Sequence, residues 1–429
     1  MSLLGELERA EPPRTDDAGV LRLVTAGSVD DGKSTLIGRL LHDSRAILED
    51  QLAAIAHASA RRGHAGIDLS LLTDGLEAER EQGITIDVAY RYFSTGRRSF
   101  ILADAPGHEQ YTRNMVTGAS TADVAVILID ARKGVLPQTR RHTYVAHTLG
   151  IRHIFVAVNK MDLVGYDRAV FEQVRADFEG FAAPLGIPDL RFFPISALRG
   201  DWIVAPGQAI AWHTGVPLLE ALETLEVQDE ADALPFRFPV QLVVRGNHSD
   251  FRGYAGRVAS GTVAVGDEVV VLPAGRRTTV REIVTLDGLR AGAVAGDSVT
   301  LRLADDIDLA RGDLIADPRR APSVSRSVQA TVCWFDDEPL RTEARYLLKH
   351  GTRTLPARVT SVAALIDVHT FERNPANAPL AMNDIAEVGL AVPQPLAFDP
   401  YADNRATGSF ILIDAATHRT VAAGMIERA

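Results

Sequence analysis

The sequence is almost without cysteine, since Cys333 is the only one among its 429 residues. No internal disulfide can form, and the neighbouring Trp334 and Phe335 predict that this side chain is a buried core residue rather than a redox group. Long apolar runs are lacking as well, and none approaches the ~20 residues that a membrane-spanning helix requires. We therefore expect neither a disulfide framework nor an association with a membrane.

Basic residues are fewer than acidic ones. The chain has 45 Lys and Arg against 56 Asp and Glu, which gives a formal net charge of −11. This balance argues against a generally basic nucleic-acid-binding protein, although a local basic patch is compatible with it. The first residues are acidic and contain proline, a composition unlike that of a signal peptide. We expect residues 1–19 to form a flexible N-terminal extension and the protein to be cytoplasmic.

A chain of this length is too long for one hydrophobic core and long enough for two or three domains. Between residues 20 and 228, apolar strands alternate with amphipathic helices, which is typical of a mostly parallel sheet with helices on both faces. The expected strands are Leu21–Ala26, Phe100–Ala103, Val124–Asp130, Ile154–Val158 and Phe192–Ile195. Helices are expected from Lys33, from Pro137 to Gly150, and from Arg168 to Ala183 with an apolar stripe of Val170, Val174, Phe178 and Phe181.

After about residue 228 the pattern changes to short β-type runs separated by glycine turns, which is typical of a small barrel or sandwich. We predict one β-domain at residues 229–322, an expected linker at Asp317–Pro322, and a second β-domain at residues 323–429. Strands of the first are expected at Val240–Val244, Gly256–Ala259, Glu268–Leu272 and Val299–Leu303. Strands of the second are expected at Ala330–Phe335, Phe410–Ile413 and Val421–Ile426.

A glycine-rich motif directly follows the first predicted strand. It has the form G-x-x-x-x-G-K-S and consists of Gly27, Ser28, Val29, Asp30, Asp31, Gly32, Lys33 and Ser34. Its glycines let the backbone wrap around phosphates, so that successive N–H groups point inward at a helix N-terminus. Lys33 supplies charge for the β- and γ-phosphates, Ser34 offers a hydroxyl to Mg²⁺, and Thr35 can reach the α-phosphate. Alone, the motif could also be a plain glycine-rich turn.

Three further motifs at the ends of later predicted strands favour a nucleotide site. The first consists of Asp104, Ala105, Pro106 and Gly107, where Asp104 can hold a metal-bound water and Gly107 can give its N–H to the γ-phosphate. Ligands of open α/β sheets bind at the carboxyl ends of the strands, so this motif and the glycine-rich loop should lie together.

The other two motifs predict the base. They consist of Asn159, Lys160, Met161 and Asp162, and of Ser196, Ala197 and Leu198. The Asp162 carboxylate can accept from the ring N1–H and the exocyclic amine of guanine, a donor pair that adenine lacks, and the backbone N–H of Ala197 can support the base. The four motifs together predict a GTP site.

The segment between Thr35 and Asp104 is too long for a simple connection and predicts a switch. Thr85 is the expected second protein ligand of Mg²⁺ beside Ser34, and its loss when the γ-phosphate leaves would release the loop. Thr85, Ser34 and the water-holding Asp104 are therefore the candidate metal residues.

His108 is the best candidate to place the attacking water in line with the γ-phosphate, the alternative being a surface histidine. With Thr85 and Asp30 it completes the set of candidate catalytic residues. The other titratable groups are expected to be structural. The charged run Glu77–Glu81 predicts a solvated helix, and the acidic run Asp305–Asp308 a solvated turn. Without metal-ligand spacing, surface or packing positions are expected for His42, His57, His64, His142 and His147.

With these motifs, and with Arg80–Asp87, the chain resembles the translational GTPases, elongation factor Tu and its relatives. Elongation factors usually have His where Asp31 stands. The strings Asp87–Phe93, Arg113–Asp123, Leu303–Asp308 and Gly408–Asp414 are instead similar to those of the GTPase subunit of bacterial sulfate adenylyltransferase. This resemblance covers the whole chain and implies a P-loop GTPase domain followed by two β-barrels.

The resemblance also implies a function. In this family the GTPase subunit pairs with a smaller catalytic subunit, which joins sulfate to the AMP moiety of ATP and releases pyrophosphate. GTP hydrolysis on the subunit drives this uphill reaction, with GTP and Mg²⁺ as the bound groups and no nucleic acid expected. Some relatives carry a fused adenylyl-sulfate kinase, but this chain has no second G-x-x-x-x-G-K-[ST] motif and we do not assign that activity.

Two other functions share the expected architecture. One is a translation factor that delivers aminoacyl-tRNA, because fold does not fix function. The other is a regulatory switch without metabolic output, which would bind GTP with negligible turnover.

Overall fold

In the computed structural model the chain divides into two compact units, Met1–Val227 and Gln228–Ala429. The structure describes residues 19–47, 87–108, 111–227, 230–246 and 251–429, together with residues 50, 52, 55, 59, 67 and 69. The predicted N-terminal extension, apart from Gly19, therefore lies outside the described residues, as do Thr85 and Glu77–Glu81. Among the described residues no helix is long and apolar enough to cross a bilayer.

The first unit is built on a six-stranded sheet with the order β2-β3-β1-β4-β5-β6. All neighbouring strands are parallel except β2, which runs antiparallel to β3 at the edge. Every residue of β4 is buried, as expected for a central strand covered on both faces. The carboxyl ends of the parallel strands meet at one edge of the sheet. The strands are β1 (Val20–Gly27), β2 (Ala89–Ser94), β3 (Ser99–Asp104), β4 (Val124–Asp130), β5 (His153–Asn159) and β6 (Asp189–Pro194).

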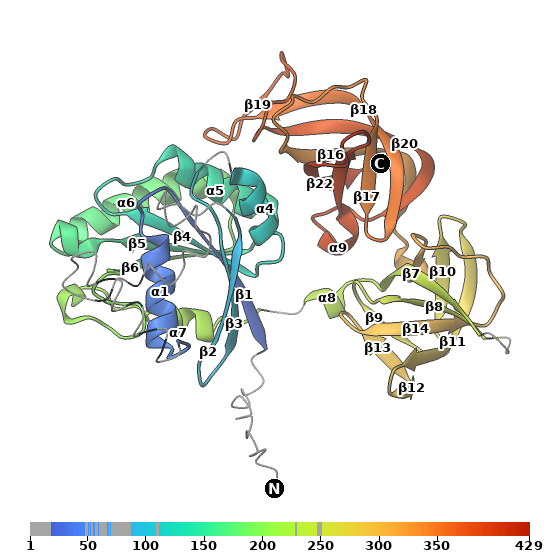
Figure 1. The fold of residues 1–429 in the computed structure, drawn as a ribbon, viewed down its shortest axis with the longest axis horizontal. Coiled ribbons are helices and arrows are strands. Elements are labelled where there is room, and N and C mark those ends of the chain that lie inside the picture. The colour runs from blue at the N-terminus through green and yellow to red at the C-terminus, as the bar shows by residue number, and fades with distance from the viewer. Residues whose placement is uncertain are drawn as a thin grey trace, which may run out of the picture. The chain divides into compact units, whose positions relative to one another are not determined.

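Helices connect these strands and pack on the sheet, with α4 beside α5 in Figure 1. Helix α5 starts at the predicted Pro137 and stops just before Gly150, which adopts a positive φ of 73°. The apolar stripe of α6 was predicted wrongly at Val170, since Phe171 is the buried residue there and packs against the ring of Trp212 at 5.4 Å. The helices are α1 (Lys33–Asp43), α4 (Thr112–Ala119), α5 (Pro137–Thr148), α6 (Arg168–Ala182) and α7 (Leu218–Glu223).

The second unit begins with the short helix α8 (Glu230–Ala233) and a closed barrel of six strands. Its order is β10-β15-β7-β8-β14-β11, and pairing of β10 with β11 closes it. The strand expected at Gly256–Ala259 was predicted too far along the chain, because β8 runs from Arg252 to Arg257. The strands are β7 (Arg237–Arg245), β8 (Arg252–Arg257), β10 (Glu268–Leu272), β11 (Arg276–Thr285), β14 (Ser298–Leu303) and β15 (Leu314–Ala316), with shorter strands β9 (Thr262–Ala264), β12 (Gly288–Arg290) and β13 (Gly292–Val294).

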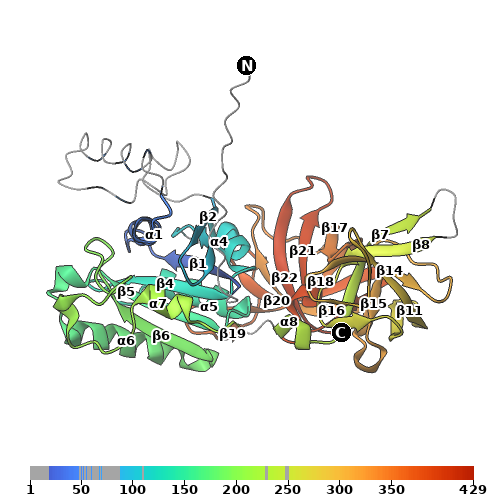
Figure 2. The same ribbon diagram turned by 90° about the horizontal axis from the view of Figure 1, so that it is seen from below.

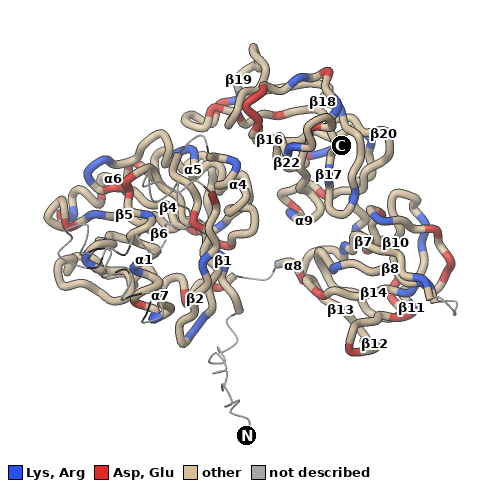
Figure 3. Tube along the Cα trace, viewed as in Figure 1, with Lys and Arg blue, Asp and Glu red and all other residues tan. Residues whose placement is uncertain are grey.

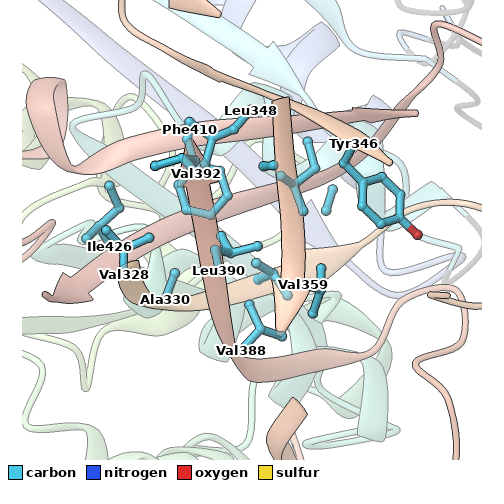
Figure 4. Packing of buried hydrophobic residues seen from close by; sticks show 14 of the residues in the cluster. Val328, Ala330, Tyr346, Leu348, Val359, Val388, Leu390, Val392, Phe410 and Ile426 are labelled. Atoms are coloured by element: carbon cyan, nitrogen blue, oxygen red, sulfur yellow. The ribbon is translucent and has the colours of Figure 1, made fainter. Parts of the chain in front are cut away.

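A second closed barrel follows, with the order β17-β21-β22-β16-β20-β18 and closure between β17 and β18. Alternate residues of β20, among them Val388 and Leu390, point into its core, where they meet side chains such as Val328 and Phe410 (Figure 4). The strands are β16 (Ser323–Trp334), β17 (Tyr346–His350), β18 (Arg353–Ile366), β20 (Ile385–Phe398), β21 (Ser409–Asp414) and β22 (Thr420–Arg428), with β19 (Arg373–Asn374) on the edge of β18 and the one-turn helix α9 (Arg405–Gly408) before β21.

The predicted fold class is thus confirmed: an α/β domain precedes two β-barrels. The barrels appear as two groups of strands in Figure 1, and their strands overlap in the view of Figure 2. Cys333 is buried in the second barrel, as expected. The expected linker Asp317–Pro322 is more ordered than predicted, since the Asp317 side chain accepts from Arg319 N and caps a 3₁₀ turn. In the acidic run, Asp306 and Asp308 are exposed and pair with Arg252.

A buried ion pair joins the two barrels within the second unit. The side chain of Arg237, at the start of β7, is only 2% exposed. Its Nε donates to Asp399 Oδ2 at 2.8 Å and its Nη2 to Asp399 Oδ1 at 2.9 Å. Thr407 Oγ1 donates to the same carboxylate at 2.6 Å, and Arg237 Nη2 also donates to the carbonyl of Arg320 at 2.7 Å. Each charge is therefore paired and hydrogen-bonded.

We expect Asp399→Ala to lower the free energy of unfolding by about 3–5 kcal/mol, because it leaves the buried Arg237 guanidinium unpaired. The loss is measured by urea unfolding, in which hydrogen exchange of peptides from the two barrels reports the unfolded fraction. Glu268→Gln is the control, since Glu268 pairs with Arg277 on the exposed surface and such pairs contribute about 0–1 kcal/mol. An Asp399→Ala loss no larger than that of the control would contradict the role of this pair.

Candidate functional site

The predicted glycine-rich loop lies between the end of β1 and the start of α1. Gly32 directly precedes the helix and has a φ of 94°, a left-handed conformation that favours glycine. A Cβ atom on Gly32 would lie 2.4 Å from Asn159 Nδ2, so a side chain would not fit there. Ser34 and Thr35 occupy the first turn of α1 and are half-buried, as is Val29 in the loop.

Lys33 lies beneath this loop. Its Nζ donates to the carbonyl oxygens of Gly27 at 2.8 Å and Ser28 at 3.3 Å. Burial lowers the pKa of the Lys33 ammonium, while the negative charges of Asp104, Asp31 and Asp30 act in the opposite direction. The carbonyl oxygens and the nearby carboxylates therefore hold this ammonium in place beneath the glycine-rich loop.

The motif at the end of β3 packs against the Lys33 ammonium. A Cβ atom on Gly107 would lie 2.6 Å from Lys33 Nζ and 2.8 Å from Gly27 O. Asp104, Ala105 and Pro106 are buried behind it, and Ala105 N donates to Thr25 O of β1 at 3.2 Å. The structure therefore brings the first two predicted motifs together. His108 follows them, half-buried, with its ring in edge contact with that of Tyr111 at 6.2 Å.

Asp31 has an unusual environment for a carboxyl group. It is 1% exposed and its Oδ2 accepts from Ser28 N at 2.7 Å. Among the residues that the structure describes, its buried Oδ1 and the buried Ser28 hydroxyl have no hydrogen-bond partner. Burial raises the pKa of Asp31 from 3.8 to about 6, against the smaller effects of the Ser28 N–H and of the Lys33 charge. This group therefore titrates closer to neutrality than an ordinary Asp.

The two motifs predicted to recognise the base also meet. Asn159 Oδ1 accepts from the backbone N–H of Ala197 at 2.9 Å, and Ser196 Oγ donates to Asp162 Oδ1 at 2.7 Å. Met161 is buried and its N–H donates to Ile195 O at 3.2 Å. These contacts hold the Asp162 carboxylate at the surface of the carboxyl edge, half-buried.

Side chains of the base motif reach back to the phosphate motif. Asn159 Nδ2 donates to the carbonyl of Asp31 at 2.8 Å, and Lys160 Nζ donates to the carbonyl of Asp30. The glycine-rich loop and the base motif are therefore in direct contact, as one nucleotide that spans both requires. All predicted site residues lie at this edge of the sheet except Thr85, which is outside the described residues.

Two residues of this region were not predicted. Arg39 of α1 donates from Nε to Ala197 O at 3.2 Å and from Nη2 to Leu198 O at 2.7 Å, which fixes the loop whose Leu198 side chain is 63% exposed. Asp130 ends β4, is fully buried, and pairs with Lys160 at 3.1 Å. Its position at a strand end between the Asp104 and Asn159 strands was a signal available in the sequence.

In the coloured, described parts of both units, Lys and Arg are interspersed with Asp and Glu (Figure 3). Within the part of the chain that the structure describes, no group of three or more His, Cys, Asp or Glu side chains could hold a metal ion. His142 is a packing residue, because it is buried in α5 and burial lowers its pKa to about 3.

Comparison with protein families agrees with this arrangement. The family model described as "Elongation factor Tu GTP binding domain" matches residues 19–228. A second model, described as "GTP-eEF1A C-terminal domain-like", matches residues 327–427 in the second barrel.

Curated relatives match over most of the chain. Sulfate adenylyltransferase subunit 1 of Laribacter hongkongensis is 53% identical over 430 residues, which cover 100% of this chain and 89% of that protein. The subunit 1 of Shewanella oneidensis is 53% identical over 95% of this chain and 85% of that protein. The bifunctional enzyme NodQ of Rhizobium meliloti is 51% identical over 96% of this chain, which spans 64% of that protein.

The pKa of Asp31 generates a prediction on stability. Between about pH 4 and about pH 6 the folded chain binds this proton more tightly than the unfolded chain, so its contribution to stability falls as pH rises. Asp31→Asn keeps an acceptor for Ser28 N–H but cannot titrate. Urea unfolding of the nucleotide-free protein should therefore show a more negative slope of stability against pH for the wild type than for Asp31→Asn. Parallel slopes would contradict the raised pKa.

Proposed function

This chain belongs to the sulfate adenylyltransferase subunit 1 family, and from that premise we propose that it is the GTP-hydrolysing subunit of a sulfate adenylyltransferase. In the proposed reaction the complex joins sulfate to the AMP moiety of ATP and releases pyrophosphate. GTP hydrolysis on this subunit supplies the driving force. The observation that carries the proposal is identity of at least 52% to four such subunits. The same identities favour sulfate activation over delivery of aminoacyl-tRNA.

GTP is proposed to bind across the contact between the phosphate and base motifs. Backbone N–H groups at the start of α1 would face its phosphates, together with the Lys33 ammonium, and Gly107 would face the γ-phosphate. The close packing at Gly32 and Gly107 supports this, because both positions admit the backbone alone. Asp162 would accept from the guanine edge, with Leu198 and the stem of Lys160 beside the ring.

Mg²⁺ is the proposed metal of this site. Its preferred ligands are oxygens, and the Ser34 hydroxyl and the buried Asp104 carboxylate are oxygen donors that follow or end two neighbouring strands, β1 and β3. Ser34 is proposed to bind the ion directly and Asp104 through water, with Thr85 as the second protein ligand. When bound, the ion would neutralise charge on the β- and γ-phosphates.

Hydrolysis requires a water molecule positioned in line with the γ-phosphate. His108 is proposed to orient it, since the side chain follows Gly107 directly and is only half-buried. Asp30 and Thr85 are the other proposed catalytic residues. Asp30, in the glycine-rich loop, adopts a positive φ of 66°, and its carbonyl accepts from Lys160.

The partner of this chain is proposed to be a smaller subunit that carries the sulfate-activating site. The name "subunit 1" of the relatives itself implies a second subunit. Ordering of the switch segment by GTP would bias the partner toward one state, because a ligand shifts an equilibrium only by its differential affinity. The cytoplasm is the proposed location.

The proposed function is tested with the chain, the catalytic subunit of a related enzyme, ATP and sulfate. Pyrophosphate release should rise when GTP is added and should not rise with a non-hydrolysable GTP analogue. His108→Ala should keep GTP binding and slow hydrolysis by about 10²-fold or more. An absence of GTP stimulation combined with tight binding of tRNA would reverse the proposed function.

Asp162→Asn is expected to change the preferred base. The amide presents a donor where the carboxylate accepted from the guanine amine, so it pairs with the carbonyl of xanthine instead. Competition binding should show affinity shifting from GTP toward xanthosine triphosphate. Asp167→Asn is a suitable control, because Asp167 caps α6 after the same loop through Ala169 N and should not affect the base. Unchanged GTP affinity in Asp162→Asn would show that the base binds elsewhere.

A further inference from the structure

One carboxylate at the carboxyl edge has no part in the proposed contacts with GTP. Asp130 is the last residue of β4 and lies directly beside Asn159 in the register of β4 and β5. Its side chain is 0% exposed. Arg132 donates to it from Nε at 3.0 Å and from Nη2 at 2.6 Å, and the Arg132 backbone N–H donates at 3.0 Å. Burying a charged carboxylate is costly unless it is paired and hydrogen-bonded, so the partners of Asp130 indicate what the residue does here.

The remaining partner of this anion is Lys160 of the base motif. Lys160 Nζ lies 3.1 Å from Asp130 Oδ2 and donates to the carbonyl of Asp30 in the phosphate loop. Burial alone would raise the pKa of Asp130, but the hydrogen bonds from Arg132 and Lys160 outweigh it and hold the pKa far below its usual range. Asp130 is therefore an anion at working pH, and it holds the Lys160 ammonium against the phosphate loop.

Lys160 is also unusual in its backbone and in its exposure. Lys160 has a φ of 63°, a left-handed conformation that is uncommon for a residue with a side chain. Its side chain is 23% exposed, so without a partner the ammonium could turn into solvent. Asp130 removes that alternative.

We propose that Asp130 is a positioning residue for nucleotide binding, which acts through Lys160 to hold the base motif and the phosphate loop in one arrangement. The inference rests on the proposed GTP binding and assigns Asp130 no contact with the nucleotide. It predicts that the strength of binding depends on a carboxylate behind the site, whereas the choice of base does not.

The test compares Asp130→Asn with wild type by titration calorimetry with GDP and Mg²⁺. The Asn amide sets an N–H against the Lys160 or Arg132 donors, so the ammonium loses its anchor. Affinity should fall about 10- to 100-fold, the range for a hydrogen bond to a charged group. Inosine diphosphate affinity should fall by the same factor, because base choice is untouched.

Asp189→Asn is the matched control. Asp189 also accepts two hydrogen bonds from an arginine two residues later, Arg191, and a third from His153, but it begins β6 at the opposite edge of the sheet. GDP affinity reduced in Asp130→Asn and unchanged in Asp189→Asn, whatever thermal stability each variant loses, supports the proposal. Equal GDP affinity in Asp130→Asn and wild type would overturn it.

Lys160→Met tests the same link without disturbing the buried carboxylate, in case Asp130→Asn does not fold. It should reproduce the loss of GDP affinity, and adding Asp130→Asn to Lys160→Met should reduce affinity no further. The proposal would be overturned if Lys160→Met bound GDP with wild-type affinity. It would also be overturned if the losses of GDP affinity from Asp130→Asn and Lys160→Met added up in the double variant. Failure of the wild type itself to bind GDP would instead refute the proposed GTP binding.

Discussion

The nucleotide site depends on the contact between two loops of one sheet, the loop after β1 and the loop after β5. Asn159 and Lys160 donate to the carbonyl oxygens of Asp31 and Asp30, so the base motif is tied to the backbone of the phosphate motif. Parallel strands bring these loops to one edge, and the side-chain hydrogen bonds hold the two motifs in contact there. A nucleotide that binds both motifs has to reach from one to the other, so their separation matters as well as the position of each loop.

The fold could be predicted where burial leaves a simple pattern. β4 is buried at every residue, and in the sequence it is an apolar run, Val124–Ile129, followed by Asp130, so its bounds were predicted as observed. β2 was missed because it is an edge strand with Tyr90 and Tyr92 exposed, so it lacks such a run. The choice of Val170 instead of Phe171 was wrong for a related reason: a stripe predicted from spacing alone does not include Trp212, the distant ring that packs against it.

The structure brings the predicted phosphate and base motifs together, but the sequence did not reveal the side chains that support them. Glycine-rich and Asp-containing strings are local, so the sequence displays them directly. Arg39 contacts the loop of Ala197, which lies 158 residues further along the chain, and no local pattern indicates such a pair. Asp130 illustrates the same limit. Its position at the end of a predicted strand indicates where the carboxylate lies, but the sequence does not indicate that Lys160 is the cation it pairs with.

The ion pair between Arg237 and Asp399 has a mechanical consequence. Bending the second unit between its barrels would separate the Arg237 guanidinium, which is only 2% exposed, from its anion. Breaking a buried ion pair is strongly unfavourable, so this contact opposes such bending.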